Sequence, residues 1–315
     1  MAGGFLAVAV VSAGVIRLRY EKTIINTMPQ TAYSAANTKL KWGVYAGGEV
    51  NEAIEVQRTV GRKPDYLPTF VHWGNNSDFP SKMAEYAYLQ RQTLVIYWEA
   101  MDYNAENPET DGRFSYGEIL TGKFDGYLET FAGVAAKYGR PIILIPFEEM
   151  NGNWYPWAVT LNGNTPQKHI DAYRYVRRFF DKATNVKFGW AINNDSIPDT
   201  QDSEPLTYYP GDKYVDYVGV NGFNFGDPWQ SWTEVFDDSL KKLATLNKPI
   251  IIFSMASGTD TKKEKWITTA GEEISSYDKL EGWIWFNQKK EQDWRIWSDP
   301  RSLRAFKRSM LGLEN

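Results

Sequence analysis

The sequence contains no cysteine, only two histidines and no block of basic residues. The absence of cysteine excludes disulfide bonds and cysteine-ligated metal sites, and it is compatible with secretion. His72 and His169 are too few for a histidine-rich metal centre, so we expect neither a metal nor another cofactor. A net charge of −4 without a basic cluster argues against nucleic acid as a partner.

Long apolar runs are also scarce. Phe5–Ile16 is apolar but too short to span a bilayer. No Lys or Arg precedes this run, whereas Arg17 and Arg19 follow it, so it is not a complete secretory signal. One interpretation is the remnant of a signal peptide or membrane anchor, which predicts a secreted or extracytoplasmic protein. The other is an ordered segment that packs on the folded domain.

The remaining chain predicts one large domain. Residues 1–39 comprise the apolar run and a polar arm, and residues 40–315 alternate between strand-like and helix-like segments. The predicted strands are 42–45, 66–73, 94–98, 142–147, 187–192, 217–220, 250–253 and 282–286. The predicted helices are 51–60, 81–91, 122–138, 166–183, 232–246, 262–276 and 300–311. Eight strands, of which all but 187–192 are followed by a predicted helix, predict an α/β fold of the (β/α)8 TIM-barrel type.

Acids, amides and aromatic residues converge in Pro141–Trp157, PIILIPFEEMNGNWYPW. Its apolar first half predicts a buried parallel strand, and Glu148 and Glu149 follow directly. Carboxylates at the carboxyl end of a barrel strand stand where such barrels carry their chemistry. The alternative is a capped strand end with surface acids, which does not explain the neighbouring Trp154 and Tyr155.

Further polar and aromatic residues follow other predicted strands. A single tryptophan at a strand end packs in the core about as often as it binds a ligand. Here six predicted strands carry aromatic or amide residues at their carboxyl ends, which face the same side of a barrel, and this favours a carbohydrate cleft. Trp42, Trp190 and Trp266 are assigned to the core. The candidate substrate-binding residues are His72, Trp98, Glu99, Glu148, Asn151, Trp154, Tyr155, Asn221, Phe223 and Trp285.

The stretch Ile145–Trp154, IPFEEMNGNW, resembles the strand-four motif R-P-F-H-E-M-N-G-x-W of glycoside hydrolase family 26. The resemblance implies that Glu149 is the acid/base. Ile145 and Glu148 depart from the motif, because the family has Arg and His there. The family contains β-mannanases, mixed-linkage β-glucanases and β-1,3-xylanases, and these departures weaken the inference of mannan specificity.

Strand seven departs from the family at one decisive position. Lys248–Gly258, KPIIIFSMASG, matches a family strand K-P-x-x-I-x-E, whose Glu is the nucleophile, and Ser254 occupies that position. A serine without an adjacent base cannot replace a carboxylate nucleophile. Three interpretations stay open: an engineered Glu-to-Ser replacement, a natural loss of activity, or a register error that leaves Ser254 in the core. Phe223 likewise stands where the family often has a tyrosine that contacts the nucleophile.

These observations predict an endo-acting retaining β-glycanase scaffold for mixed-linkage β-1,3-1,4-glucan. Its hydrolysis is expected to be crippled, and it is expected to have glycosynthase potential. The alternatives are an endo-β-1,4-mannanase and a non-catalytic glycan-binding barrel. The expected partners are β-glucan or β-mannan polysaccharides and their oligosaccharides, with a membrane contacted only through an N-terminal anchor. We expect a monomer.

Overall fold

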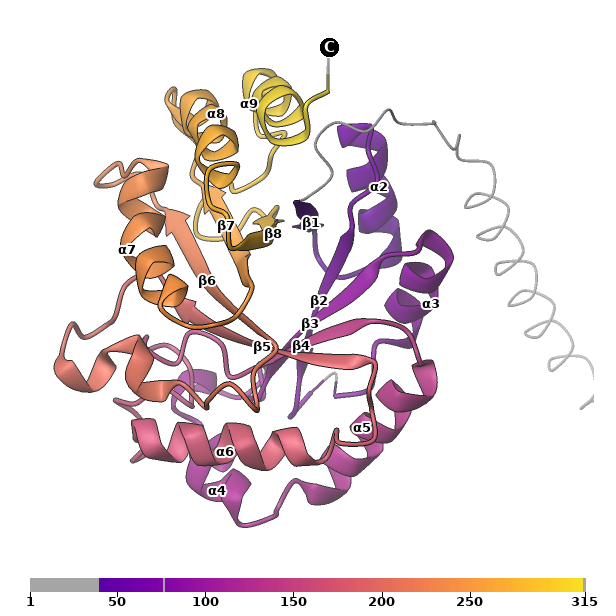
Figure 1. Cartoon of the computed structure of the whole chain (residues 1–315), viewed down its shortest axis with the longest axis vertical. Coiled ribbons are helices and arrows are strands. Elements are labelled where there is room, and N and C mark those ends of the chain that lie inside the picture. The colour runs from indigo at the N-terminus through magenta and orange to yellow at the C-terminus, as the bar shows by residue number, and fades with distance from the viewer. Residues whose placement is uncertain (1–39, 76, 314–315) are drawn as a thin grey trace, which may run out of the picture. The chain divides into compact units, whose positions relative to one another are not determined.

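The computed structural model describes residues 40–75 and 77–313, and the predicted apolar run and polar arm lie outside these ranges. Eight parallel strands close into a barrel in sequence order, as Figure 1 shows. This confirms the predicted TIM barrel. The strands are β1 (Lys41–Tyr45), β2 (Tyr66–His72), β3 (Thr93–Glu99), β4 (Ile142–Pro146), β5 (Val186–Asn193), β6 (Tyr217–Asn224), β7 (Ile250–Ser257) and β8 (Leu280–Phe286).

Helices surround the strands (Figure 1). Most carry recognisable end signals: Ser231 and Glu234 form a capping box at α7, and Gly61 ends α2 in a left-handed conformation. The helices are α2 (Val50–Val60), α3 (Ser81–Gln90), α4 (Tyr116–Leu120), α5 (Asp125–Tyr138), α6 (Pro166–Arg178), α7 (Trp232–Ala244), α8 (Lys263–Ile274) and α9 (Pro300–Ala305), and a π-helical turn follows at Phe306–Met310.

The connection between β5 and β6 contains no α-helix, in agreement with the absence of a predicted helix between residues 192 and 217. It contains only two short 3-10 turns, Gln201–Ser203 and Pro205–Tyr208. Prolines at positions 198, 205 and 210 explain this, because proline lacks the backbone N–H that a helix interior needs. The unpredicted helix α4 starts in the long loop after β3, where the Ser115 side chain accepts a hydrogen bond from the Glu118 N–H.

The barrel interior is a packed core rather than a channel. Strand residues that point inward form one cluster, and Phe70 and Tyr217 pack against it. Ile145 belongs to this cluster and is fully buried, so the departure from the family's Arg is accommodated by packing. The other members are Tyr66, Val95, Tyr97, Ile143, Ala191, Ile251, Phe253 and Ile284.

Strand β7 contains a β-bulge beside Ser254. Against β6, Ile252 pairs with Val220 whereas Ser254 pairs with Asn221, so β7 has one extra residue there. The pairing with β8 shifts between Ile252 and Met255 as well. The Tyr97 hydroxyl crosses the barrel from β3 and donates to the Phe253 carbonyl. Bulges re-aim the side chains that follow them, so this one determines which way Ser254 faces.

Candidate active site

The turn after β4 presents the two adjacent glutamates. Phe147 and Glu149 have positive φ angles of 57° and 55°, a conformation that costs free energy in residues other than glycine. The turn is held in place from two sides. The Glu149 N–H donates to the Ala191 carbonyl of β5 at 2.9 Å, and the Trp157 indole donates to the Glu148 carbonyl at 2.8 Å. Strain at this turn is typical of functional sites.

Glu149 is partly exposed, and two donors fix its carboxylate. The Trp154 indole N–H donates to Oε2 and the Asn221 amide donates to Oε1, each at 2.8 Å. Burial raises the pKa of Glu149, and the negative charge of Glu99 raises it further. The two hydrogen bonds and Lys290 act in the opposite direction, since they stabilise the ionised form. The pKa of Glu149 is therefore raised in a half-buried site, which suits a general acid.

Ser254 lies on the same face of the sheet as Asn221. The two residues are paired across β6 and β7, and paired residues of neighbouring strands point to the same side. Because the Asn221 amide reaches Glu149, this pairing brings the ends of β4, β6 and β7 together. Ser254 is 5% exposed and lies inside β7, which runs four residues beyond the predicted end of that strand.

Glu99, Glu148, His72 and Tyr155 form a second group beside Glu149. His72 Nε2 lies 2.6 Å from Glu99 Oε2. Burial, followed by the negative charge of Glu99, raises the pKa of Tyr155. Glu148 is fully buried, and burial followed by the charge of Glu99 places its pKa well above the usual range. The sequence predicted all four residues as substrate contacts, but only His72 and Tyr155 are partly exposed.

Asn151 has a structural role, which corrects its prediction as a substrate-binding residue. It is fully buried, and its side chain ties the loop after β4 to the end of β5. Its amide donates to the carbonyls of Asn193 and Asp195 and to the Ser196 hydroxyl, and its oxygen accepts from the Asn193 N–H. These contacts leave little capacity for a sugar hydroxyl.

Trp98 and Trp285 do not line the cleft, and the prediction that they do is wrong. Both are fully buried. Trp98 donates to the Tyr127 hydroxyl of α5 and stacks on Phe131 of the same helix. Trp285 lies edge-on to Trp266 of α8. These two side chains therefore join the strands to the helices around them. Trp42, Trp190 and Trp266 are buried as predicted.

Other aromatic residues are partly exposed near the strand ends. Trp154 is partly exposed, Tyr155 stacks on Trp157 at 4.3 Å between ring centroids, and Phe223 contacts Phe286. The sequence analysis missed four further aromatic residues that are partly or fully exposed: Tyr45, Phe70, Tyr103 and Phe225. Tyr103 lies in the long loop and Phe225 after a predicted strand, whereas Tyr45 and Phe70 lie inside predicted strands. Contacts between Tyr45 and both Phe70 and Phe286 join β1, β2 and β8.

Two other features of the described ranges bear on ligands. Within residues 40–75 and 77–313, no group of acids and histidines is arranged to hold a metal ion.

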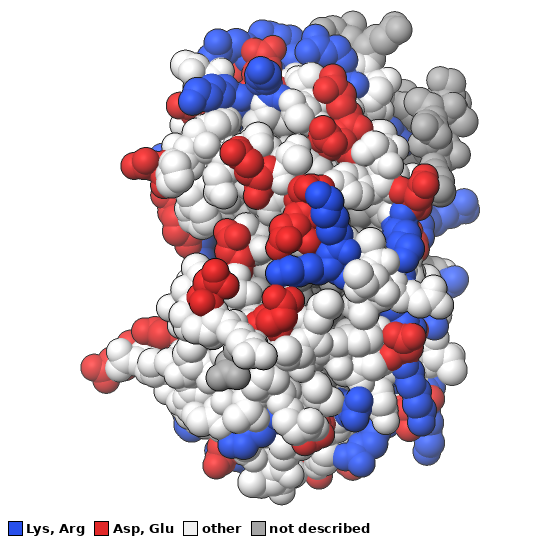
Figure 2. Space-filling view, turned by 60° about the vertical axis from the view of Figure 1, so that its left-hand side comes forward, with Lys and Arg blue, Asp and Glu red and all other residues white. Residues whose placement is uncertain are grey.

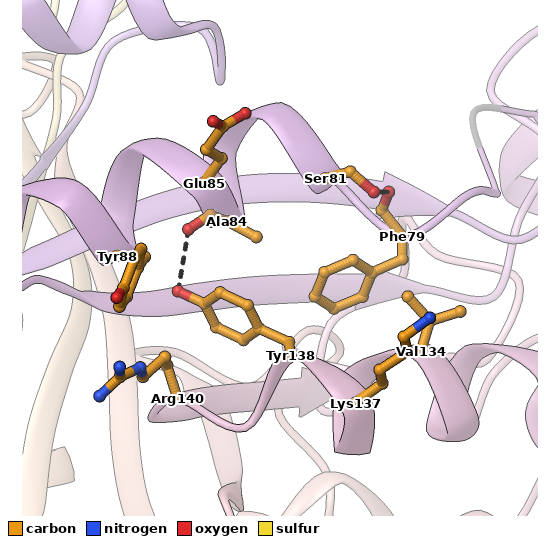
Figure 3. A pocket seen from close by; sticks show the side chains of 9 residues that line it. All are labelled: Phe79, Ser81, Ala84, Glu85, Tyr88, Val134, Lys137, Tyr138 and Arg140. Atoms are coloured by element: carbon orange, nitrogen blue, oxygen red, sulfur yellow. Dashed lines mark hydrogen bonds between the residues drawn. The ribbon is translucent and has the colours of Figure 1, made fainter. Parts of the chain in front are cut away.

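A pocket between α3 and α5 is lined by Phe79, Tyr88, Val134 and Arg140, and in it the Tyr138 hydroxyl donates to the Ala84 carbonyl (Figure 3). None of its lining residues belongs to the predicted site. Acidic and basic side chains are interspersed on the face in Figure 2.

Comparison with known proteins identifies the family. The sequence model of glycosyl hydrolase family 26 matches residues 115–295, which include β4, Glu149 and β7. The chain belongs to this family. Family 26 membership gives it the scaffold of a glycoside hydrolase, an enzyme that acts on O-glycosyl bonds.

The relatives of the chain differ in their named activities. The chain is 35% identical over 288 residues to Endoglucanase H of Acetivibrio thermocellus, and the matched region covers 87% of this chain and 31% of that protein. It is 27% identical over 116 residues to a mannan endo-1,4-β-mannosidase of Bacillus subtilis, covering 35% of this chain and 29% of the relative. The chain thus spans about a third or less of these relatives.

Solved structures support the fold. A family 26 β-mannanase of Bacteroides ovatus superimposes with a TM-score of 0.64 at 15% identity, covering 87% of this chain and 89% of that chain. The catalytic domain of a family 26 endo-β-1,4-mannanase from a Bacillus species gives a TM-score of 0.65 at 15% identity, covering 87% of each chain.

Proposed function

We propose that this chain is an endo-acting β-glycanase scaffold for mixed-linkage β-1,3-1,4-glucan, in which Ser254 removes the nucleophile and disables hydrolysis. The observation that carries the proposal is the setting of Glu149. It is a partly exposed carboxyl group at the carboxyl end of β4, held by Trp154 and Asn221, in a family 26 chain. Retaining glycosidases need a second carboxylate about 5–5.5 Å from the acid/base. Ser254 is paired with Asn221, whose amide reaches Glu149, and this supports taking position 254 as the place of that carboxylate.

The preference for glucan over mannan rests on two observations. The relative with 35% identity is named an endoglucanase. In addition, Glu148 replaces the His of the motif associated with mannanases, and this changes the charge beside Glu149. Mannan is the second candidate, because shorter matches at 27% identity carry the name mannan endo-1,4-β-mannosidase.

In this proposal Glu149 has two roles. In a form of the protein with Glu at position 254, it would protonate the leaving oxygen and then deprotonate the attacking water. With Ser254 there is no carboxylate on β7 to attack the anomeric carbon. The shorter serine side chain would leave room on the α face of a bound sugar. We expect Glu149 to titrate lower with Ser254 than with Glu at that position, because a neighbouring negative charge is missing.

The proposal predicts glycosynthase activity. An α-glycosyl fluoride would occupy the room beside Ser254, and its C1–F bond would break as fluoride leaves with help from the serine hydroxyl. The acceptor hydroxyl would form the new β C–O bond while its proton passes to the Glu149 carboxylate. The products are a β-linked oligosaccharide and fluoride, and the disabled site does not cut the new bond.

The experiment is a condensation assay with an α-fluoride of a β-glucan disaccharide and an acceptor oligosaccharide. We expect time-dependent fluoride release and β-linked products, and Glu149→Ala in the same chain should abolish both. The matched control is Glu106→Gln, an exposed carboxylate on the loop after β3, which should leave the rate unchanged. Robust hydrolysis of polysaccharide by the unaltered chain would contradict the mechanism, because another group would then serve as nucleophile.

A further inference from the structure

Phe225 is an exposed aromatic residue at the mouth of the barrel, the side on which the carboxyl ends of the strands lie. It directly follows Asn224, the last residue of β6, and it is 52% exposed. A single exposed apolar side chain needs no explanation by itself. This one, however, stands on the face where barrels of this type carry their chemistry. The roles described so far do not account for its position.

The loop that carries Phe225 is anchored by Asn224. The side chain of Asn224 is fully buried, and its oxygen accepts hydrogen bonds from the N–H groups of Gly226 and Gln230, each at 3.1 Å. Its amide donates to the hydroxyl of Ser257, the last residue of β7, at 3.2 Å. These contacts tie both ends of the turn to the sheet, so the place of Phe225 is fixed by the fold.

Trp294 supports the Phe225 ring from below. The two ring centroids are 5.1 Å apart, and the ring planes are nearly perpendicular at 88°. Trp294 is buried, and its carbonyl accepts a hydrogen bond from the Trp285 indole at 2.8 Å. An edge-to-face contact covers at most one face of the Phe225 ring. The protein therefore holds this ring in place and leaves a flat apolar face open.

A series of rings connects Phe225 with the candidate active site. The Phe223 centroid lies 6.2 Å from that of Phe225 and 5.7 Å from that of Phe286 on β8. Phe223 and Asn221 are two residues apart on β6, so their side chains point to the same side of the strand. Because the Asn221 amide donates to Glu149, the series runs outward from the acid to Phe225.

We propose that Phe225 is a specificity-determining platform that stacks on a unit of the β-glucan chain beyond the unit on which Glu149 acts. The C–H groups on the face of a β-linked sugar ring would pack on the open face of the phenylalanine, and both surfaces would leave water. Phenylalanine has no hydrogen-bonding group, so the contact makes binding depend on chain length. The inference rests on the proposed function in taking a β-glucan as the ligand.

Isothermal titration calorimetry tests the platform with a ladder of mixed-linkage β-glucan oligosaccharides, from the disaccharide to the hexasaccharide. Phe225→Ala should raise the Kd about fivefold for the longer members only, because about half of the burial energy of a phenylalanine ring is removed. Phe225→Tyr keeps the ring and should bind like the unaltered chain. Phe225→Leu keeps apolar bulk against Trp294 but lacks a flat face, so it should also bind more weakly.

The matched control is Tyr88→Ala, because Tyr88 is exposed to a similar extent, 50%, but lies on α3. It should leave every Kd unchanged. If Phe225→Ala binds the whole ladder like the unaltered chain, or loses as much affinity for the disaccharide as for the hexasaccharide, the inference is wrong while the proposed function stands. If the unaltered chain binds no oligosaccharide of the ladder, the proposed function fails and this inference fails with it.

Discussion

His169 should make the protein sensitive to acid. It is fully buried in α6, and the Trp190 indole donates to its Nε2 atom at 3.3 Å. The proton of the neutral ring is therefore on Nδ1, where it donates to the Tyr116 hydroxyl at 2.5 Å. Burial lowers the pKa of His169 to about 3 from the usual value of 6.5.

The sign and size of the effect follow from this difference. The unfolded chain binds a proton at His169 below pH 6.5, whereas the folded chain does so only near pH 3. The stability that depends on neutral His169 is complete above pH 6.5 and is lost as the pH falls. At about 1.4 kcal/mol per pH unit, a change from pH 7 to pH 5 removes about 2 kcal/mol of the free energy of unfolding.

Urea unfolding at pH 7 and pH 5 measures the effect, with His169→Gln as the comparison. Glu148 and Glu149 have raised pKa values, so they add stability as the pH falls, but they do so in both proteins. The loss between pH 7 and pH 5 should be about 2 kcal/mol larger in the unaltered chain. Equal losses would refute the reasoning. If the variant does not fold, imidazole NMR of the unaltered chain decides: a His169 ring that gains a proton between pH 7 and pH 5 contradicts the prediction.

Three further predictions concern single side chains. Trp154→Phe should raise the pKa of Glu149 in an NMR titration, because it removes an indole hydrogen bond but keeps an aromatic ring, and Trp154→Ala should in addition weaken oligosaccharide binding in calorimetry. Trp98→Ala and Trp285→Ala should each lower the free energy of unfolding by about 3–5 kcal/mol, because both rings are buried against helices. If urea unfolding shows no loss of stability, the two rings do not have this packing role. Lys263 is fully buried, donates to two carbonyls and a hydroxyl, and has its pKa lowered by burial to about 8. Its contribution should therefore raise stability by about 1.4 kcal/mol per pH unit from pH 8 towards 10.5, and Lys263→Met should lack this slope in unfolding experiments.

The sequence was sufficient for the barrel. The apolar run before Glu149 predicted the end of β4 to within one residue, whereas β7 runs four residues past its predicted end and contains Ser254. The same patterns could not distinguish the cleft from the core for Trp98 and Trp285. Both faces of a barrel strand are buried, one by the interior and one by helices, so alternation does not reveal which side is which.

Two other features depend on contacts between distant segments. Asn151 resembles a cleft amide in the sequence, but its polar atoms are used by the end of β5. The bulge in β7 appears only when the strand is paired with both neighbours, and it determines the direction of Ser254. The turn after β4 likewise depends on contacts with β5, which hold Phe147 and Glu149 at positive φ angles.

The most direct test of the central claim compares the unaltered chain with Ser254→Glu in a hydrolysis panel of lichenan, mannan, β-1,3-xylan and cellulose. Restoring a carboxylate at this position should restore the nucleophile that the scaffold lacks. We expect hydrolysis of mixed-linkage glucan to rise by about three orders of magnitude or more, in line with the loss seen when a catalytic nucleophile is removed. Activity on mannan should be lower than on lichenan. Robust hydrolysis by the unaltered chain, or an inactive Ser254→Glu on all four polysaccharides, would contradict the account.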